Sequence, residues 1–245
     1  MLTKKKRSVS VVVAKEKTLP PDRVARRKNA TRARLIKAAY GVMTTAGVDA
    51  AKIQDITDQA DVGFGTFYNY FGTKDELAGR VLDCVIDDLG RRNDFATARY
   101  KSSDPGRVMP VSIRLVLREA LTTPMWQWWV LRPDLLVDRM RVGFSRFGIR
   151  DIQKAIAAGV YHVDALGVET SWNLAVWMMV GGMRDILVNR APLKREQLVV
   201  EAIMRIMGVP IELAHGFCSG ALPHYPPAEI DFGFWLPNLE DGAES

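Results

Sequence analysis

The sequence predicts an all-α protein in which a small N-terminal helical domain precedes a larger helical domain. Apolar residues recur at spacings of three and four along most of the chain, which is the period of an amphipathic helix. Proline, glycine or short polar stretches separate these segments, and no segment shows the strict alternation of a half-buried strand. A chain of 245 residues is long enough for two such domains around a sizeable core.

The first domain begins with one long helix and two short ones. From Thr31 to Ala46 the apolar residues fall on one helical face, and Gly47 ends the helix. Residues 52–60 form a second, short helix, after which A-D-V-G marks a tight turn, and a third helix starts near Phe64. Two short helices joined by a tight turn and packed on a longer helix are typical of a helix-turn-helix unit.

The third helix has to be short, because Gly72 and Thr73 interrupt it. The following T-K-D-E is a capping box, in which Thr73 and Glu76 satisfy each other's free backbone N–H groups at the start of a fourth helix. Apolar residues continue that helix to about Leu89. We therefore expect the first domain to span residues 29–88.

Positive charge is concentrated at the N-terminal end. Of the 34 Lys and Arg residues, thirteen lie in residues 1–37 against two acidic residues, whereas the rest of the chain carries 21 basic and 26 acidic residues. This asymmetry favours a polyanionic partner, since each phosphate neutralised by Lys or Arg releases counterions. We expect residues 1–28 to form a flexible basic arm that reaches a minor groove of DNA, with a merely solvated tail as the alternative.

Five aromatic residues lie within eight positions of the run F-G-T-F-Y-N-Y-F that starts at Phe64. On a helix with 100° between residues, Phe67 and Phe71 share one face and are expected to fill the small core. The opposite face carries small and polar side chains that suit base edges in a major groove, namely those of Gly65, Thr66 and Asn69.

The remaining rings of this run have other roles. Tyr68 and Tyr70 flank the polar face, and each combines a flat body with a hydroxyl group that can reach a phosphate. Phe64 lies at the border of the two faces, so core packing and contact with a thymine methyl group both stay open for it.

The segments T-R-A-R-L-I-K-A-A-Y-G-V-M-T-T-A-G-V-D and I-Q-D-I-T-D-Q-A-D-V-G-F-G-T-F-Y-N-Y-F-G-T-K-D-E-L together resemble the DNA-binding domain of the TetR family of bacterial transcriptional regulators. The resemblance covers about residues 29–80, and its core G-T-F-Y-N-Y-F-G-T-K-D-E-L is specific. Two positions depart from the family pattern, since Ala51 replaces a Thr cap and Asp61 replaces a turn Gly. Asp tolerates left-handed backbone better than most residues, so we expect the turn to be retained.

The resemblance implies further contacts with DNA. Lys74 matches a phosphate contact of the family, and a cation beside free N–H groups at a helix start is suited to phosphate; a solvated lysine is the alternative. Thr31, Lys52 and Gln54 match other family positions that face DNA. The predicted DNA-binding residues are therefore Thr31, Lys52, Gln54, Phe64, Gly65, Thr66, Tyr68, Asn69, Tyr70 and Lys74.

Residues 89–210 are expected to form the larger domain. Its predicted helices span residues 107–123, 133–147, 149–158, 170–189 and 193–207. In the TetR family the last two helices usually form a four-helix bundle with a second subunit, which implies a homodimer. The corresponding contacts here are Leu174, Met178, Gly181, Gly182, Asp185, Leu198, Ala202 and Ile206. Two mid-helix glycines cost about 1 kcal/mol each in helix propensity, so they predict that another backbone approaches closely.

The larger domain carries many bulky, adaptable apolar side chains, which suit a flat or long apolar ligand. The family resemblance implies a small-molecule effector pocket here, with candidate residues Met125, Trp126, Trp129, Met140, Phe144, Phe147, Trp172 and Trp177. Core packing is the alternative for each of them. Candidate polar groups that would orient a ligand are Arg132, Asp134, His162 and Asn173.

Residues 211–245 are rich in proline and aromatic residues, and we predict an extended strap, not a regular helix, packed on its own or a partner subunit. His215, Cys218 and His224 match no standard zinc spacing, so no metal is expected. The only other cysteine is Cys84, so the sequence does not suggest a disulfide framework and fits a reducing cytoplasm.

The sequence lacks the common motifs of enzymes. It contains no P-loop, no complete dinucleotide-binding glycine motif, no G-x-S-x-G and no H-E-x-x-H, and no apolar run is long enough to span a membrane. We therefore expect a cytoplasmic bacterial regulator without a cofactor, associated with the nucleoid when bound. It would be a homodimeric repressor that a small apolar or aromatic ligand releases from a pseudo-palindromic operator in double-stranded DNA. A non-specific architectural DNA-binding protein without ligand control is the alternative.

Overall fold

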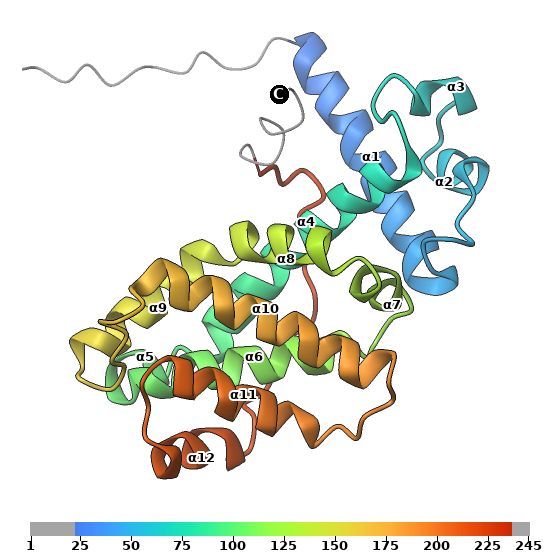
Figure 1. Ribbon diagram of the computed structural model, residues 1–245. Helices are drawn as coiled ribbons and strands as arrows, with labels where there is room; N and C mark the ends of the chain where they lie inside the picture. Colours follow the sequence, from blue (N-terminus) through green and yellow to red (C-terminus); the bar gives the residue numbers. More distant parts are fainter. Residues whose placement is uncertain (1–22, 237–245) are drawn as a thin grey trace, which may run out of the picture.

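The structure is a computed structural model that describes residues 23–236, and in this range it contains helices, turns and loops but no strand (Figure 1). The first domain comprises α1 (Arg23–Ala46), α2 (Ile53–Gln59), α3 (Phe64–Phe67) and the first half of α4 (Lys74–Ala96). The larger domain contains the rest of α4, followed by α5 (Tyr100–Ser103), η1 (Pro105–Arg107), α6 (Val108–Glu119), α7 (Met125–Val130), α8 (Pro133–Gly143), α9 (Ser145–Ala157), α10 (Val168–Leu187), α11 (Arg195–Ile206) and α12 (Ile211–Ser219).

The core of the first domain confirms the assignment of the two phenylalanines. Phe67 and Phe71 are 0% and 1% exposed, and their ring centroids lie 5.9 Å apart. Leu35 and Met43 of α1 and Leu77 of α4 are fully buried in the same core. The short α3 is thus held in place by apolar packing and not by its own length, since isolated helices of this size are unstable.

The turn and cap chemistry of the helix-turn-helix is also as expected. Asp61 adopts a left-handed backbone with φ of 52°, which the family's usual glycine would provide at less cost. At the start of α4, the Glu76 N–H donates to Thr73 Oγ1 (3.1 Å). The Glu76 carboxylate accepts from the N–H of Gly72 (2.7 Å), one residue before the expected partner. Helix α2 begins at Ile53, and its N-cap residue Lys52 makes no side-chain capping hydrogen bond.

Two helix boundaries differ from the prediction. Helix α1 starts at Arg23, so residues 23–28 are helical and not part of a flexible arm, because R-V-A-R-R-K consists mostly of good helix formers. Residues 1–22 of the predicted arm lie outside the described residues. Helix α4 continues to Ala96, so the predicted boundary at residue 88 falls inside a helix that both domains share.

Helix α10 lies at the centre of the larger domain, where it packs against α6, α7, α8, α9 and α11. The five helices predicted for this domain are all present, with ends shifted by a few residues. The short α7 was not predicted, and it lies between the domains, where Trp128 Nε1 donates to Asp49 Oδ1 (2.7 Å) in the loop after α1. Among residues 23–236, no helix has both the length and the apolar character needed to cross a bilayer.

The C-terminal segment begins with a helix, which corrects the prediction that residues 211–245 are extended. Ala214, Phe217 and Cys218 are buried on one face of α12, and no proline falls between Pro210 and Pro223 to interrupt it. Residues 220–236 then continue without a helix, and residues 237–245 lie outside the described part of the chain.

Both cysteines should be chemically inert in the folded protein. Burial raises the pKa of Cys84 to about 12 and that of Cys218 to about 11. At pH 8 only roughly one Cys84 thiol in ten thousand would be the reactive thiolate. We expect Ellman's reagent to modify neither cysteine within minutes at pH 8, and to modify both after unfolding in guanidinium. Rapid release of two equivalents of thionitrobenzoate from the native protein would contradict this expectation.

Candidate DNA interface and ligand pocket

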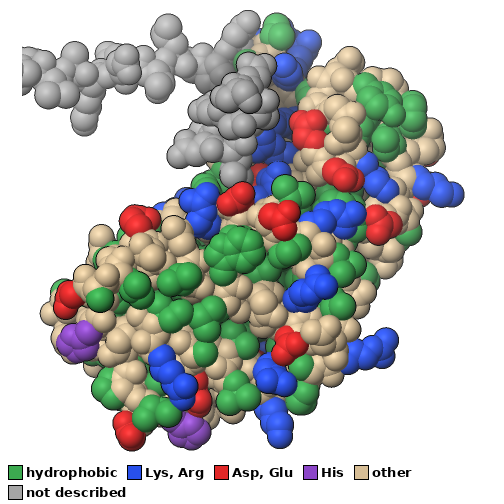
Figure 2. All heavy atoms as spheres, in the orientation of Figure 1, with side chains coloured by type: hydrophobic (Ala, Val, Ile, Leu, Met, Phe, Trp, Pro, Cys, Tyr) green, Lys and Arg blue, Asp and Glu red, His purple; other side chains and the backbone are tan. Residues whose placement is uncertain are grey.

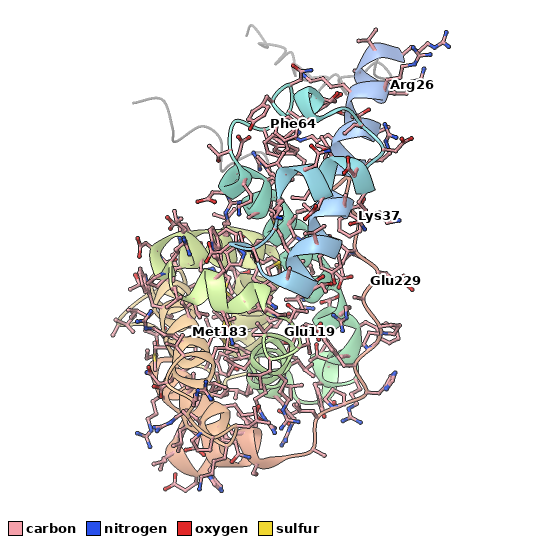
Figure 3. All side chains as sticks on the ribbon, turned by 90° about the vertical axis from the view of Figure 1, so that its right-hand side faces the viewer. Arg26, Lys37, Phe64, Glu119, Met183 and Glu229 are labelled. Atoms are coloured by element: carbon pink, nitrogen blue, oxygen red, sulfur yellow. The ribbon has the colours of Figure 1, made fainter. Side chains whose placement is uncertain are left out.

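The surface around α3 exposes aromatic rings at the outer end of the first domain. Phe64, which Figure 3 labels, and Tyr68 are 46% and 55% exposed. Their rings meet edge to face with centroids 5.8 Å apart. Phe64 is therefore a surface residue, because Phe67 already occupies the core position beneath it. A Cβ atom added to Gly65 would have no neighbour within 4 Å, so another molecule can approach the backbone closely here.

The other candidate DNA-binding residues surround this exposed pair. Lys52, Gln54 and Asn69 are exposed, whereas Thr31, Thr66, Tyr70 and Lys74 are partly exposed. Some of them already have partners: the Gln54 amide donates to Asp58 Oδ1 (2.6 Å), and Lys74 Nζ donates to the carbonyl groups of Asp49 (2.9 Å) and Ala51 (3.0 Å). An ammonium group has three N–H donors, so one donor of Lys74 remains for a phosphate.

Helix α1 adds positive charge to this domain. Its exposed basic residues are Arg23, Arg26, Arg27, Lys28, Arg34 and Lys37. Figure 3 shows Arg26 at the free end of the helix and Lys37 farther along it. These side chains supply the cationic groups that phosphate binding requires, next to a helix-turn-helix whose reading surface is exposed.

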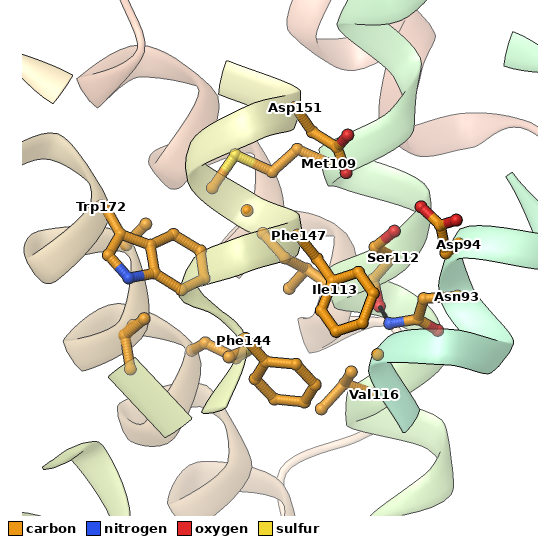
Figure 4. Close-up of a pocket in the computed structure, with 15 residues that line it drawn as sticks. Asn93, Asp94, Met109, Ser112, Ile113, Val116, Phe144, Phe147, Asp151 and Trp172 are labelled. Atoms are coloured by element: carbon orange, nitrogen blue, oxygen red, sulfur yellow. Dashed lines mark hydrogen bonds between the residues drawn. The ribbon is translucent and has the colours of Figure 1, made fainter. Parts of the chain in front are cut away.

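A buried pocket lies in the larger domain, among α4, α6, α9 and α10 (Figure 4). It encloses about 570 Å³ that no protein atom fills, part of it open to solvent. Its walls are mainly apolar and aromatic. The lining residues are Gly90, Asn93, Asp94, Met109, Ser112, Ile113, Val116, Phe144, Phe147, Gly148, Asp151, Trp172, Ala175, Val176 and Met179.

Two glycines bring the aromatic walls of the pocket close to the helix backbones. A Cβ atom at Gly90 of α4 would collide with the Phe147 ring, and one at Gly148 of α9 would collide with the Trp172 ring. The Trp172 indole is fixed further by its Nε1, which donates to the Arg141 carbonyl (3.1 Å). The rings are therefore held in defined positions and form flat walls.

One end of the pocket is polar and includes an acceptor without a partner. Asn93 Nδ2 donates to the Ser112 carbonyl (3.3 Å), but Asn93 Oδ1 is buried and has no hydrogen-bond donor among the described residues. A buried acceptor left unpaired costs about 1–3 kcal/mol. Asn93 therefore has an unused acceptor beside a pocket whose walls are mainly apolar.

Two carboxylates lie at the same end and are tied to one arginine. Arg150 contacts Asp94 (2.5 Å) and Asp151 (2.8 Å), and Lys101 also pairs with Asp94 (2.5 Å). Burial alone would raise the pKa of Asp94, but hydrogen bonds from Lys101 and Arg150 hold it below its usual value. Burial raises the pKa of Asp151 despite the same arginine. The polar end therefore combines an ionised Asp94 with several acceptor oxygens.

Further ion pairs continue from the pocket along α4 toward the first domain. Asp87 pairs with Arg146 of α9, and Asp83 pairs with Arg139 of α8 (2.6 Å). The two aspartates are 5% or less exposed in their side chains. Each pair joins a buried aspartate of α4 to a more exposed arginine of the neighbouring helix and so connects α4 to α8 and α9.

Only some of the predicted pocket residues line this cavity. Phe144, Phe147 and Trp172 line it, but Met125, Trp126, Trp129 and Met140 are buried elsewhere in the core and Trp177 is 49% exposed. The three residues from 125–129 lie on α7, which fills the junction between α1 and α10. None of the candidate polar residues Arg132, Asp134, His162 and Asn173 lines the cavity. The sequence analysis did not identify Asn93, Asp94 and Asp151 as pocket residues. A polar residue at a helix position that is expected to be buried could have indicated them.

An apolar surface lies over α10 and α11 (Figure 2). Leu174, Trp177 and Leu198 are 39%, 49% and 55% exposed, and Gly181 is exposed between them. Four other residues predicted for the dimer contact are partly exposed: Met178, Asp185, Ala202 and Ile206. Gly182 is different, because it is buried and a Cβ atom there would lie 2.7 Å from Val199 Cγ2 of α11 in the same chain. This glycine serves packing within the subunit, which corrects its assignment to a partner contact.

Comparison with known proteins agrees with this architecture. Residues 35–81 match the profile of the bacterial regulatory proteins of the tetR family. Over 71 residues, 29% of the chain, the sequence is 32% identical to the HTH-type transcriptional repressor KstR2 of Mycobacterium tuberculosis. Over 60 residues, 24% of the chain, it is 37% identical to the HTH-type transcriptional repressor DhaR of Mycobacterium sp. (strain GP1). These matches span 36% and 30%, about a third, of the length of the curated relatives.

The likeness to solved structures extends over both domains. The crystal structure of RolR in complex with resorcinol has a TM-score of 0.75 at 25% identity, and it covers 82% of this chain and 100% of the RolR chain. RolR without ligand has a TM-score of 0.71 at 24% identity, covering 80% of this chain and 100% of that one. The named relatives are repressors, in agreement with the prediction that the chain is not an enzyme. The first domain therefore matches the tetR family of bacterial regulatory proteins, and the chain shares the fold of RolR over both domains.

Proposed function

We propose that this chain is a homodimeric transcriptional repressor of the bacterial cytoplasm, released from a pseudo-palindromic operator by a small aromatic ligand that carries hydroxyl groups. The observation that carries the proposal is the path of α4, which starts at the reading domain and lines the ligand pocket with Gly90, Asn93 and Asp94. A ligand that favours one position of α4 therefore biases the position of the reading head.

The chemistry of the pocket supports a hydroxylated aromatic ring as the ligand. Phe147 and Trp172 offer flat apolar walls, whereas Asn93 Oδ1 and the nearby carboxylates accept hydrogen bonds. A ring with hydroxyl groups suits both features. Its faces pack against the apolar walls, and the hydroxyl groups at its edge donate to the acceptor oxygens. RolR, which has the same fold, was crystallised with resorcinol, a benzene ring with two hydroxyl groups.

Electrophoretic mobility shift on the DNA upstream of the protein's own gene tests the proposal. We expect a specific fragment to be retained against excess competitor DNA at physiological salt and to be released by resorcinol or another hydroxylated aromatic compound, but not by its methyl ethers. Equal retention of all fragments would favour the non-specific architectural alternative, which predicts the same affinity for upstream DNA and for unrelated DNA. Release by purely apolar compounds would contradict the role of the polar end.

The dimer is expected to use the apolar surface over α10 and α11. Leu198→Glu places a carboxylate where a partner would bury it, so we expect the dimer to dissociate at micromolar concentration. The measurement is sedimentation velocity. Leu135→Glu is a matched control, since Leu135 of α8 is 54% exposed and Leu198 is 55% exposed. Dissociation of both variants, or of neither, would count against this surface.

A further inference from the structure

Residues 220–236, the C-terminal strap, connect the far end of the larger domain with the first domain. The strap leaves α12 next to α6, where Arg114 Nη1 donates to the Gly220 carbonyl (2.7 Å). It then runs beside α4 toward α1, past Glu229 (Figure 3). The strap has no helix of its own, so its position depends on the contacts that it makes with these helices.

A lower anchor holds the strap to the part of α4 that belongs to the larger domain. Arg92 Nε donates to the Pro226 carbonyl (2.9 Å), and Arg91 Nη2 donates to the Glu229 carbonyl (3.1 Å). The Glu229 N–H in turn donates to Asp88 Oδ1 (3.0 Å). The Arg92 guanidinium also lies 4.0 Å from the centroid of the Tyr225 ring. Charged groups take part in all three hydrogen bonds, which makes them stronger than neutral ones.

An upper anchor holds the strap to the first domain. The Trp235 ring lies between two guanidinium groups, with Arg32 Cζ of α1 at 3.3 Å and Arg80 Cζ of α4 at 3.9 Å from its centroid. Phe232 packs against Tyr40 of α1, with ring centroids 5.4 Å apart. Tryptophan is the side chain that gains most from a cation above its ring, and here it has one on each face.

We propose that the C-terminal strap is a brace that fixes the first domain against the larger domain and so transmits movement of α4 to the reading head. Only residues 230 and 231 separate Glu229 of the lower anchor from Phe232 of the upper one, and a residue spans at most about 3.6 Å. These three steps span at most about 11 Å, so a rotation of α1 that would carry the Phe232 contact farther than this from Glu229 has to break one of the two anchors.

The coupling between effector and operator rests on the proposed function. The fixed orientation of the two domains does not. A braced first domain follows α4, so the ligand pocket controls the reading head. Without the brace, the first domain samples several orientations whatever the pocket contains, and the coupling between effector and operator weakens. The structural and functional parts can be measured separately.

Trp235→Ala tests the structural part. Spin labels at Asp55→Cys of α2 and Gln153→Cys of α9, both exposed positions, report the distance between the domains. They are introduced in a Cys84→Ala, Cys218→Ala background, and labelled chains are diluted with unlabelled ones so that pairs within one subunit dominate. We expect electron–electron double resonance to give a narrow distance distribution with Trp235, a broad one in Trp235→Ala, and an intermediate one in Trp235→Phe.

Phe95→Ala is the control, because Phe95 is an aromatic residue of the same α4 that is 71% exposed. It should leave the distribution narrow. Circular dichroism establishes that each variant is folded, and Phe232→Ala provides a second way to loosen the upper anchor if Trp235→Ala is not folded. An unchanged width in folded Trp235→Ala or Phe232→Ala overturns the brace, whether or not the protein binds an operator.

The functional part is tested by the ratio of operator Kd values with and without a saturating hydroxylated aromatic effector such as resorcinol. We expect this ratio to fall at least about threefold in Trp235→Ala, within the range typical of allosteric coupling, and to stay unchanged in Phe95→Ala. An unchanged ratio in Trp235→Ala overturns the transmitting role. If the unaltered protein retains no operator at all, the proposed function fails, while the distance measurement still decides the brace.

Discussion

Gly65→Glu is expected to abolish specific DNA binding without unfolding the protein. A side chain at this position meets no atom within 4 Å, so the fold has room for it. Its carboxylate would lie on the exposed face of α3, which faces DNA phosphates and base acceptors in the proposed complex. Unfavourable like-charge contacts at an interface cost several kcal/mol, so operator affinity should fall at least about 100-fold.

Gly216→Glu is the matched control for this prediction. Gly216 is also an exposed helical glycine with no atom within 4 Å of an added Cβ, but it lies on α12 at the far end of the larger domain. Fluorescence anisotropy with a labelled operator should show a loss of binding for Gly65→Glu only, at equal thermal stability. Equal affinities for the two variants would remove α3 from the DNA interface.

The first domain could be predicted in most of its detail because local rules decide its structure. The capping box at Thr73, the left-handed turn at Asp61 and the burial of Phe67 and Phe71 each follow from one residue type at one position. The exposure of Phe64 could not be predicted in this way. It depends on whether Phe67 fills the core beneath it, which is a matter of packing between helices.

The larger domain could be predicted in its helices but not in its pocket. Helix periodicity indicates which side chains are buried, but it does not distinguish a buried side chain that fills space from one that borders a cavity. Trp126 and Trp172 have the same chemistry, and only the position of α7 between the domains makes the first a core residue. An extended strap was predicted, but its contacts with α4 could not be, because these partners lie more than 130 positions away in the sequence.

Asn93→Leu is expected to lower the affinity for a hydroxylated aromatic ligand about 5- to 150-fold, which corresponds to about 1–3 kcal/mol for a lost partner of a buried polar group. Leucine has a similar size, so the aromatic walls should keep their positions. The unbound protein loses a buried oxygen without a donor. Its free energy of unfolding should therefore stay unchanged or rise by up to about 1 kcal/mol, as is common when a functional polar group is replaced.

Isothermal titration calorimetry with resorcinol and thermal denaturation of the unbound protein measure these two effects. Asn173→Leu is the control, since Asn173 lies on α10, is partly exposed and does not line the pocket. Weaker binding together with an equal drop in stability would mean that Asn93 only supports the fold. Weaker binding at undiminished stability would support a direct contact between the ligand and Asn93. The dimethyl ether of resorcinol, which has no hydroxyl donor, should bind Asn93→Leu and the unaltered protein with similar, weak affinity.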